Sequence, residues 1–196
     1  MLEPQRFFVR EQVSLLKTTD VYDILDADTQ QQVATAVEEP GQLVSLLRWV
    51  VHKKLMPTII HVRSVPDNAL LFTLRRPVSF WRDRVEVYDA SGQRLGHFTG
   101  KVFTIGGGLI VFDRNGQQFA DVKGDWVGWN FRFLTPDGQE LGIVTKKWAG
   151  IGQELFTTAD NYIVAINDSL KDQVEAKVLL LAAALAIDIV YYEDNV

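Results

Sequence analysis

The stretch that decides the fold is Val85-Glu86-Val87-Tyr88-Asp89-Ala90-Ser91-Gly92-Gln93-Arg94-Leu95-Gly96, because its pattern occurs three times. Residues 109–120 and 131–142 repeat it, and the turn glycines lie 24 and then 22 residues apart. Each copy alternates apolar and polar residues, turns on Ser-Gly, Asn-Gly or Asp-Gly, and then alternates again. This pattern is typical of a β-hairpin whose glycine supplies a positive φ. A degenerate fourth copy spans residues 22–30, with Thr29 where the glycine would stand.

Alternating segments continue along most of the chain and predict a mainly β protein of about twelve strands. Because a meander of this size must protect its edges or close, we expect a closed β-barrel. Thirteen segments compete for these strands, so that one is expected to be wrong or merged with a neighbour. They lie near residues 6–16, 20–25, 31–38, 57–63, 68–75, 83–89, 93–99, 101–105, 108–112, 117–123, 129–134, 139–146 and 161–166.

An uninterrupted apolar run extends from Val178 to Ile187 and resumes after Asp188. A membrane-spanning helix needs about 20 predominantly apolar residues, whereas a shorter run is more typical of a buried helix. The run is apolar on every face, unlike an amphipathic surface helix. We therefore predict a central helix wrapped by the barrel, with a transmembrane segment as the alternative. Its expected core residues are Val178, Leu181, Leu185 and Ile189. Ser169-Leu170-Lys171-Asp172 looks like a capping box, which predicts a start near Leu170.

A short amphipathic helix is predicted over residues 42–54, after Pro40-Gly41. Its apolar residues recur at i, i+3, i+4 and i+7, which gives one apolar stripe: Leu43, Leu46, Leu47 and Val50. Trp49, Lys53 and Lys54 lie off this stripe. The helix either plugs one end of the barrel or lies on a membrane surface, where Trp and Lys suit the lipid interface.

The densest basic cluster is Arg75-Arg76 with Arg82 and Arg84, and Phe80-Trp81 lies within it. One interpretation is a solvated loop near Pro77. The other is a contact with an anion or a lipid headgroup, to which Arg75, Arg76, Trp81 and Arg82 would contribute.

The composition indicates a soluble globular protein. The 196 residues include 20 basic and 25 acidic side chains, a net charge of −5, and 47% are hydrophobic. A general nucleic-acid binder would normally be basic, so no specific nucleic acid is expected. The sequence has no cysteine, which excludes disulfides and thiolate metal sites. No secretory signal is recognised, so the expected location is the cytoplasm, and residues 1–196 are expected to form one domain.

No catalytic residues are predicted. His52, His61 and His97 share no metal-ligand spacing, and no G-x-S-x-G motif occurs. The sequence therefore gives no reason to expect an enzyme or a cofactor.

The C-terminal third resembles the phospholipid scramblase family. The residues are Lys147-Trp148-Ala149-Gly150-Ile151, then Phe156-Thr157-Thr158-Ala159-Asp160-Asn161-Tyr162, and an apolar helix ending in Ile187-Asp188 and a tyrosine pair. Residues 71–77 and 12–16 extend the resemblance to nearly the whole chain. LURP-one-related proteins and the Tubby C-terminal domain share the family's architecture. The resemblance implies a twelve-stranded barrel around a central hydrophobic helix, and a link to membranes and phospholipids.

The calcium segment of the animal members is matched only in part. Asp160 and Asn161 keep its centre, but Thr158 and Ser169 stand where the family has aspartates. Because Ca²⁺ affinity depends on the number of charged oxygen ligands, calcium binding is expected to be weak or absent. The cysteine-rich stretch that carries lipid anchors in animal members is missing as well.

Three functions stay open at this point. The first is a membrane-associated phospholipid- or phosphoinositide-binding protein, peripheral at the inner face of the plasma membrane, whose partners are headgroups or the membrane surface. The second is an intracellular ligand- or protein-interaction module without membrane activity. The third is a catalyst of phospholipid scrambling, although a closed barrel offers no evident path for a headgroup across about 30 Å of hydrocarbon.

Overall fold

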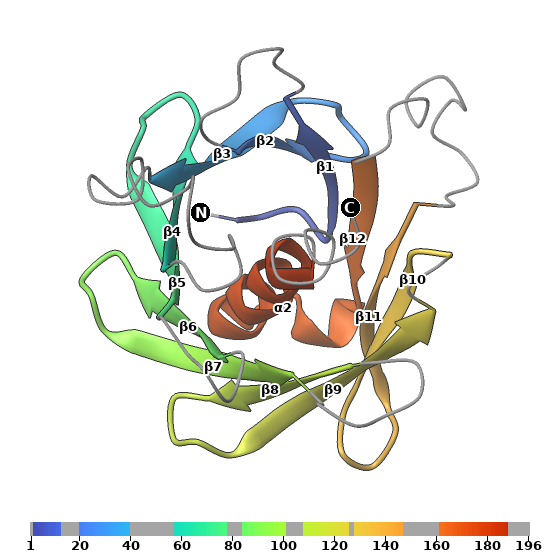
Figure 1. The fold of residues 1–196 in the computed structure, drawn as a ribbon. Helices are drawn as coiled ribbons and strands as arrows, with labels where there is room; N and C mark the ends of the chain where they lie inside the picture. The colour runs from blue at the N-terminus through green and yellow to red at the C-terminus, as the bar shows by residue number, and fades with distance from the viewer. Residues whose placement is uncertain are drawn as a thin grey trace.

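Twelve antiparallel strands close into a barrel in the part of the chain that the computed structural model describes (Figure 1). The described residues are 2–12, 20–39, 57–77, 84–100, 108–125, 128–146 and 161–187. The strands are β1 (Arg6–Glu11), β2 (Val21–Asp26), β3 (Gln32–Glu39), β4 (Thr58–Ser64), β5 (Leu70–Arg76), β6 (Arg84–Asp89), β7 (Arg94–Gly100), β8 (Leu109–Asp113), β9 (Gln118–Asp125), β10 (Asn130–Leu134), β11 (Glu140–Thr145) and β12 (Asn161–Ile166).

Each strand pairs with the next one in sequence, and β1 pairs with β12 to close the ring. Phe7 of β1 lies opposite Val164 of β12 on one side and Asp26 of β2 on the other. A closed ring leaves no unpaired strand edge, which is the solution expected for a meander of this size. The expected closed twelve-stranded barrel is thus confirmed. The additional strand predicted at 101–105 falls outside the described residues.

The three repeated hairpins turn in the same way. Asp89 donates its backbone N–H to the carbonyl of Gln93 and accepts one from Gly92, and its carboxylate accepts from the N–H groups of Ser91 and Gln93. The other two turns, 113–117 and 135–139, repeat the backbone pattern. Their glycines have φ of 82°, 77° and 91°, and a register shift precedes each turn. The recurring sequence therefore encodes a recurring turn with a bulge.

The fourth copy differs from the other three by one residue. The backbone N–H of Asp26 bonds to the carbonyl of Gln31, five residues on, instead of four. The longer turn moves the positive φ to Gln30, at 60°, so that Thr29 does not take the place of the glycine. The alignment of Thr29 with the turn glycines was therefore wrong.

A single long helix in the described chain, α2 (Val174–Ile187), fills the barrel (Figure 1). Leu181 and Leu185 are completely buried and Val178 is 7% exposed. The helix contacts β5, β6, β7 and β12, so that it meets strands on several sides. This surrounding explains why its sequence is apolar all round. Ile189 lies outside the described residues.

The start of α2 differs from the prediction. A 3₁₀ turn, η3 (Asp168–Leu170), follows β12, and Asn167 caps it by accepting a hydrogen bond from the backbone N–H of Ser169 at 2.9 Å. The α-helix begins only at Val174. Leu170 is buried in the core, which anchors the tight turn that redirects the chain into the barrel. The predicted capping box at Ser169 and Asp172 is therefore not formed.

None of the helices in the described residues is long and apolar enough to cross a membrane.

The two ends of the barrel are different. At the turn end lie the five hairpin turns, near residues 27–31, 65–69, 90–93, 114–117 and 135–139, and the connection 167–173 into α2. At the loop end lie the other strand ends, from which the remaining connections between the strands depart. These include Glu39, Thr58, Arg76, Arg84 and Asn161. The two ends differ because all neighbouring strands are antiparallel, so that successive connections alternate between them.

Candidate functional site

Three arginines gather on the outer face of β5, β6 and β7. Arg75 of β5 lies opposite Glu86 of β6, and Glu86 lies opposite His97 of β7. Arg84 and Arg94 flank these positions on β6 and β7. Side chains alternate between the faces of a strand, and the neighbours Leu74, Val85, Val87 and Phe98 belong to the core. We call Arg75, Arg84, Arg94, Glu86, Tyr88 and His97 the outer arginine cluster.

Glu86 lies at the centre of this cluster. One carboxylate oxygen forms an ion pair with Arg84 at 3.1 Å, and the other accepts a hydrogen bond from the Tyr88 hydroxyl at 2.7 Å. This hydrogen bond is the main reason why the pKa of Tyr88 lies above its usual value. Glu86 thus neutralises one of the three arginines, and the cluster keeps a net charge of +2.

Arg75 and Arg94 carry the remaining positive charge. Both are exposed, and among the described residues no salt bridge reaches either of them. The guanidinium of Arg75 lies over the ring of Tyr88, 4.9 Å from its centroid. A cation on an aromatic face is held in place while its edge N–H groups stay open to other acceptors.

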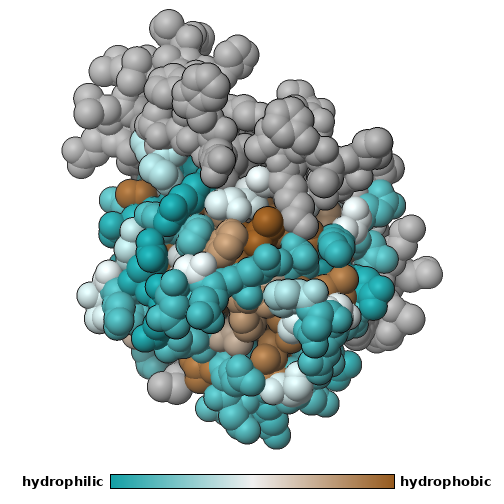
Figure 2. Space-filling model, turned by 90° about the horizontal axis from the view of Figure 1, so that it is seen from below, coloured by the Kyte–Doolittle hydropathy of each residue, from teal (hydrophilic) through white to brown (hydrophobic). Residues whose placement is uncertain are grey.

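His97 links the cluster to an apolar strip on β8. Its ring stacks on Phe112 with centroids 4.7 Å apart and planes at 8°. Burial, and then the charges of Arg84 and Arg94, lower the pKa of His97. Phe112 and Ile110 are partly exposed on the same outer face. Seen from the side of β8 and β9, apolar residues gather in the middle of a face bordered by hydrophilic ones (Figure 2). The cluster therefore combines cations with apolar surface.

The structure separates two of the residues that the sequence placed in one basic cluster. Arg75 points outward, whereas Arg76 shares the inner face of β5 with Phe72 and Leu74 and is 8% exposed. Trp81 and Arg82 lie outside the described residues, as do Trp49, Lys53 and Lys54 with the whole helix predicted for 42–54. In sequence, Trp81 and Arg82 fall between β5 and β6, whose flanking ends lie at the loop end.

The remnant of the calcium segment is described only at Asn161. Asn161 begins β12 at the loop end, lies opposite Arg10 and is 5% exposed, whereas Asp160 lies outside the described residues. Within the described ranges, no group of three or more His, Asp or Glu side chains is arranged to hold a metal ion. Weak or absent calcium binding stays a prediction.

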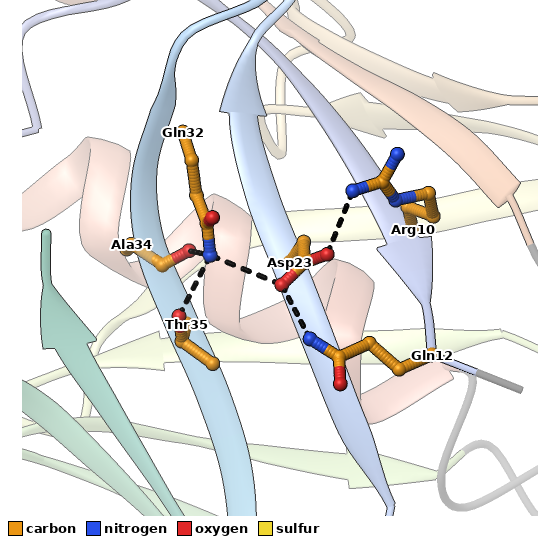
Figure 3. Close-up of polar contacts among 6 residues, drawn as sticks. All are labelled: Arg10, Gln12, Asp23, Gln32, Ala34 and Thr35. Carbon is orange, nitrogen blue, oxygen red and sulfur yellow. Dashed lines mark hydrogen bonds and ion pairs between the residues drawn. The ribbon is translucent and has the colours of Figure 1, made fainter. Parts of the chain in front are cut away.

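A second polar group, on the outer face of β1 to β3, is a structural network (Figure 3). Asp23, 6% exposed, forms an ion pair with Arg10 at 2.8 Å. Its other oxygen accepts hydrogen bonds from Gln12 at 2.7 Å and Gln32 at 3.0 Å. Gln32 also bonds to Thr35 at 2.9 Å. Because both carboxylate oxygens are occupied within the protein, the network ties three strands together and leaves Asp23 little capacity for a ligand.

Sequence reasoning missed Tyr88, Arg94 and His97. Each lies in a predicted strand, but only the strand register brings them to Arg75. The alternation in β6, where Arg84, Glu86 and Tyr88 share one face, could have found Tyr88, but it carries no signal for Arg94 and His97 on β7.

Together, the fold and this surface define a closed β-barrel around a hydrophobic helix with a cationic outer cluster. The family model described as Scramblase matches residues 9–194, and the chain belongs to this family. The residues quoted above for the resemblance, including the Trp-x-Gly and Ala-Asp-Asn stretches, lie within the matched range.

Two relatives are similar to this chain. The "Altered inheritance rate of mitochondria protein 25" of Saccharomyces cerevisiae is 22% identical over 212 residues, which cover 89% of this chain. The match covers 64% of that protein, so this chain spans less than two thirds of its length. An X-ray structure of a protein from Arabidopsis thaliana matches with a TM-score of 0.52 at 12% identity, and covers 93% of this chain and 92% of the other. This second likeness shows the fold alone.

Proposed function

We propose that this Scramblase-family protein binds phospholipid headgroups at a membrane surface through the outer arginine cluster. The observation that carries the proposal is the pair Arg75 and Arg94, exposed and without an ion pair in the described chain, on a protein of net charge −5. A local positive surface on an acidic protein orients the molecule toward an anionic partner.

The chemistry of the cluster suits a phosphate in the headgroup region. A guanidinium binds phosphate oxygens with two parallel N–H···O bonds, which a compact ammonium cannot do. Tyr88, beneath Arg75, is an aromatic residue with a polar tip, a type that is enriched at membrane interfaces. Phe112, next to His97, adds apolar surface at the edge of the cluster. Each basic residue near an anionic surface contributes about 1 kcal/mol.

The proposal extends to location and activity. We place the protein at the cytoplasmic face of the plasma membrane, attached peripherally, as a Tubby-like and LURP-one-like barrel that takes part in phospholipid scrambling by holding headgroups. Family membership supports this extension. Because α2 fills the barrel, the contact with the surface of the bilayer is assigned to the outer face of the barrel.

Charge reversal tests the proposal. We would measure cosedimentation with vesicles that contain phosphatidylserine. The affinity of the double variant Arg75→Glu and Arg94→Glu should be lower by at least about tenfold, because two favourable charges become unfavourable. The matched control is Lys123→Glu with Lys171→Glu, which makes the same change in net charge at two exposed positions elsewhere. The control should bind nearly as the parent does. Equal binding by parent and double variant would remove the cluster from the membrane contact, and a parent that binds no vesicle would favour the interaction module.

A further inference from the structure

Arg76 is a charged side chain inside the barrel. Arg76 is the last residue of β5 and lies at the loop end. It shares the inner face of the strand with Phe72 and Leu74, and its side chain is buried, with 8% of the residue exposed. Thr58, the first residue of β4, lies opposite and is also buried, on the inner face of Ile60 and Val62. The two residues place a guanidinium and a hydroxyl side by side among the core residues at one barrel end.

Arg76 is under-bonded for a buried cation. Its Nη2 donates to Thr58 Oγ1 at 3.0 Å, whereas its Nε has no hydrogen-bond partner. Among the described residues, no carboxylate forms a salt bridge with Arg76. Glu38, which faces inward from β3 at the same end, is not paired with it either. A guanidinium keeps its charge at any physiological pH, and burial of an unpaired charge is strongly unfavourable. The arrangement therefore calls for an anion.

We propose that Arg76 and Thr58 form an interior binding site for a phosphate group. The guanidinium would offer its free N–H groups in a planar fork, the geometry that matches two phosphate oxygens. The Thr58 hydroxyl accepts from Arg76 and keeps its own proton to donate to a third oxygen. The phosphate belongs to a phospholipid headgroup or is free phosphate. The assignment to lipid rests on the proposed function, whereas the site itself does not.

Binding of two soluble probes tests the site without any membrane. We would titrate inorganic phosphate and dihexanoyl phosphatidic acid, below its micelle concentration, into the whole chain. Calorimetry measures the affinity, and NMR follows the Arg76 Nε–Hε resonance. At least one probe should bind and shift this resonance. Binding of the lipid alone identifies a headgroup, and equal binding of both identifies free phosphate. If neither probe binds, the proposal is wrong.

Matched variants connect the binding to Arg76. Arg76→Met keeps an apolar stem but removes the guanidinium, and it should weaken binding about tenfold or more, because a hydrogen-bonded charge pair is lost. Thr58→Val should weaken phosphate binding several-fold, because it removes the hydroxyl and leaves the charge of Arg76 in place. Arg63→Met, on the same pair of strands but at the turn end, should bind as the parent does. If Arg76→Met fails to fold, the proposal is tested by the affinity of Thr58→Val and by the shift of the Arg76 Nε–Hε resonance in the parent protein. Unchanged affinity in Thr58→Val together with an unshifted resonance would overturn the proposal.

Thermal stability gives a second readout. Phosphate should raise the melting temperature of the parent but not that of Arg76→Met, since a ligand stabilises only the state that binds it. An equal rise in both would place the anion elsewhere and contradict the site. The Arg75→Glu and Arg94→Glu protein separates the two proposals, because it should lose vesicle binding and keep phosphate binding.

Discussion

Lys177 belongs to the central helix, and its ammonium group donates a hydrogen bond to the backbone carbonyl of Glu3 at 2.9 Å. It also reaches the carbonyl of Lys171 at 3.4 Å. Lys177 is 3% exposed, and Leu2 of the same N-terminal segment belongs to the core. One buried cation in α2 thus bonds to the N-terminal segment and to the residue that follows η3. Burial lowers the pKa of this lysine, with Glu3 and Asp172 opposing the shift.

Lys177→Met should not lower the melting temperature near neutral pH. The substitution keeps the apolar stem, removes the cost of a buried charge, and leaves two carbonyls of exposed residues that water can reach. The folded-state pKa lies below the unfolded value of 10.5. The parent therefore gains stability as pH rises from the folded pKa to 10.5, and the variant should lack this gain. Thermal melts from neutral to alkaline pH measure both effects. A Lys177→Met variant that melts far below the parent at neutral pH would show that the hydrogen bonds of Lys177 stabilise the fold.

Leu181→Ala and Leu185→Ala should each lower the free energy of unfolding by about 2–5 kcal/mol, through lost burial and the cavity left behind. Both leucines are completely buried among strands. Urea titration followed by tryptophan fluorescence measures the change. Leu185→Asp should not fold, and a stable Leu185→Asp protein would reject the central-helix account.

Gly96→Ala should destabilise the barrel by about 1–3 kcal/mol, as overpacking does. A Cβ at Gly96 would lie 2.2 Å from the carbonyl oxygen of Phe112 and 2.9 Å from a methyl carbon of Leu179 in α2. Gly92→Asn is the control, because that turn position has open space and a φ of 82°, which asparagine tolerates. Two variants of equal stability would mean that β7 can move away from both β8 and the helix.

His97 should make stability fall on acidification. Its folded-state pKa lies below the unfolded value of 6.5, so the unfolded chain binds more protons between the two values. Stability is then lost as pH falls from 6.5 through the folded pKa. His97→Gln should flatten this part of the profile, as measured by thermal melts between pH 7.5 and about 5. An unchanged slope in His97→Gln would assign the acid sensitivity to other groups.

Most of the barrel could be predicted from the sequence because its signals are local. The Asp-Ala-Ser-Gly-Gln turn carries its own hydrogen bonds, and the run from Val178 to Ile187 is apolar on every side whatever surrounds it. The start of α2 could not be predicted in this way, because the burial of Leu170 and the Asn167 cap compete with the capping box at Ser169.

The outer arginine cluster was predictable only in part. Arg75 stood out as one of two adjacent basic residues, but strand alternation sends Arg76 to the opposite face. Arg94 and His97 reach the cluster through the pairing of β6 with β7, which contains a bulge between Val87 and Tyr88. A bulge shifts the register by one residue, and local sequence does not fix which neighbours it brings together.

Vesicle binding of the unaltered protein as a function of salt tests the central claim most directly. The account predicts cosedimentation with vesicles of phosphatidylcholine and phosphatidylserine, little with phosphatidylcholine alone, and a steady loss as ionic strength rises, because exposed charges are screened within about 10 Å at 0.1 M salt. Equal binding to both kinds of vesicle, unaffected by salt, would contradict an electrostatic contact through Arg75 and Arg94. Binding to neither would contradict the membrane function itself.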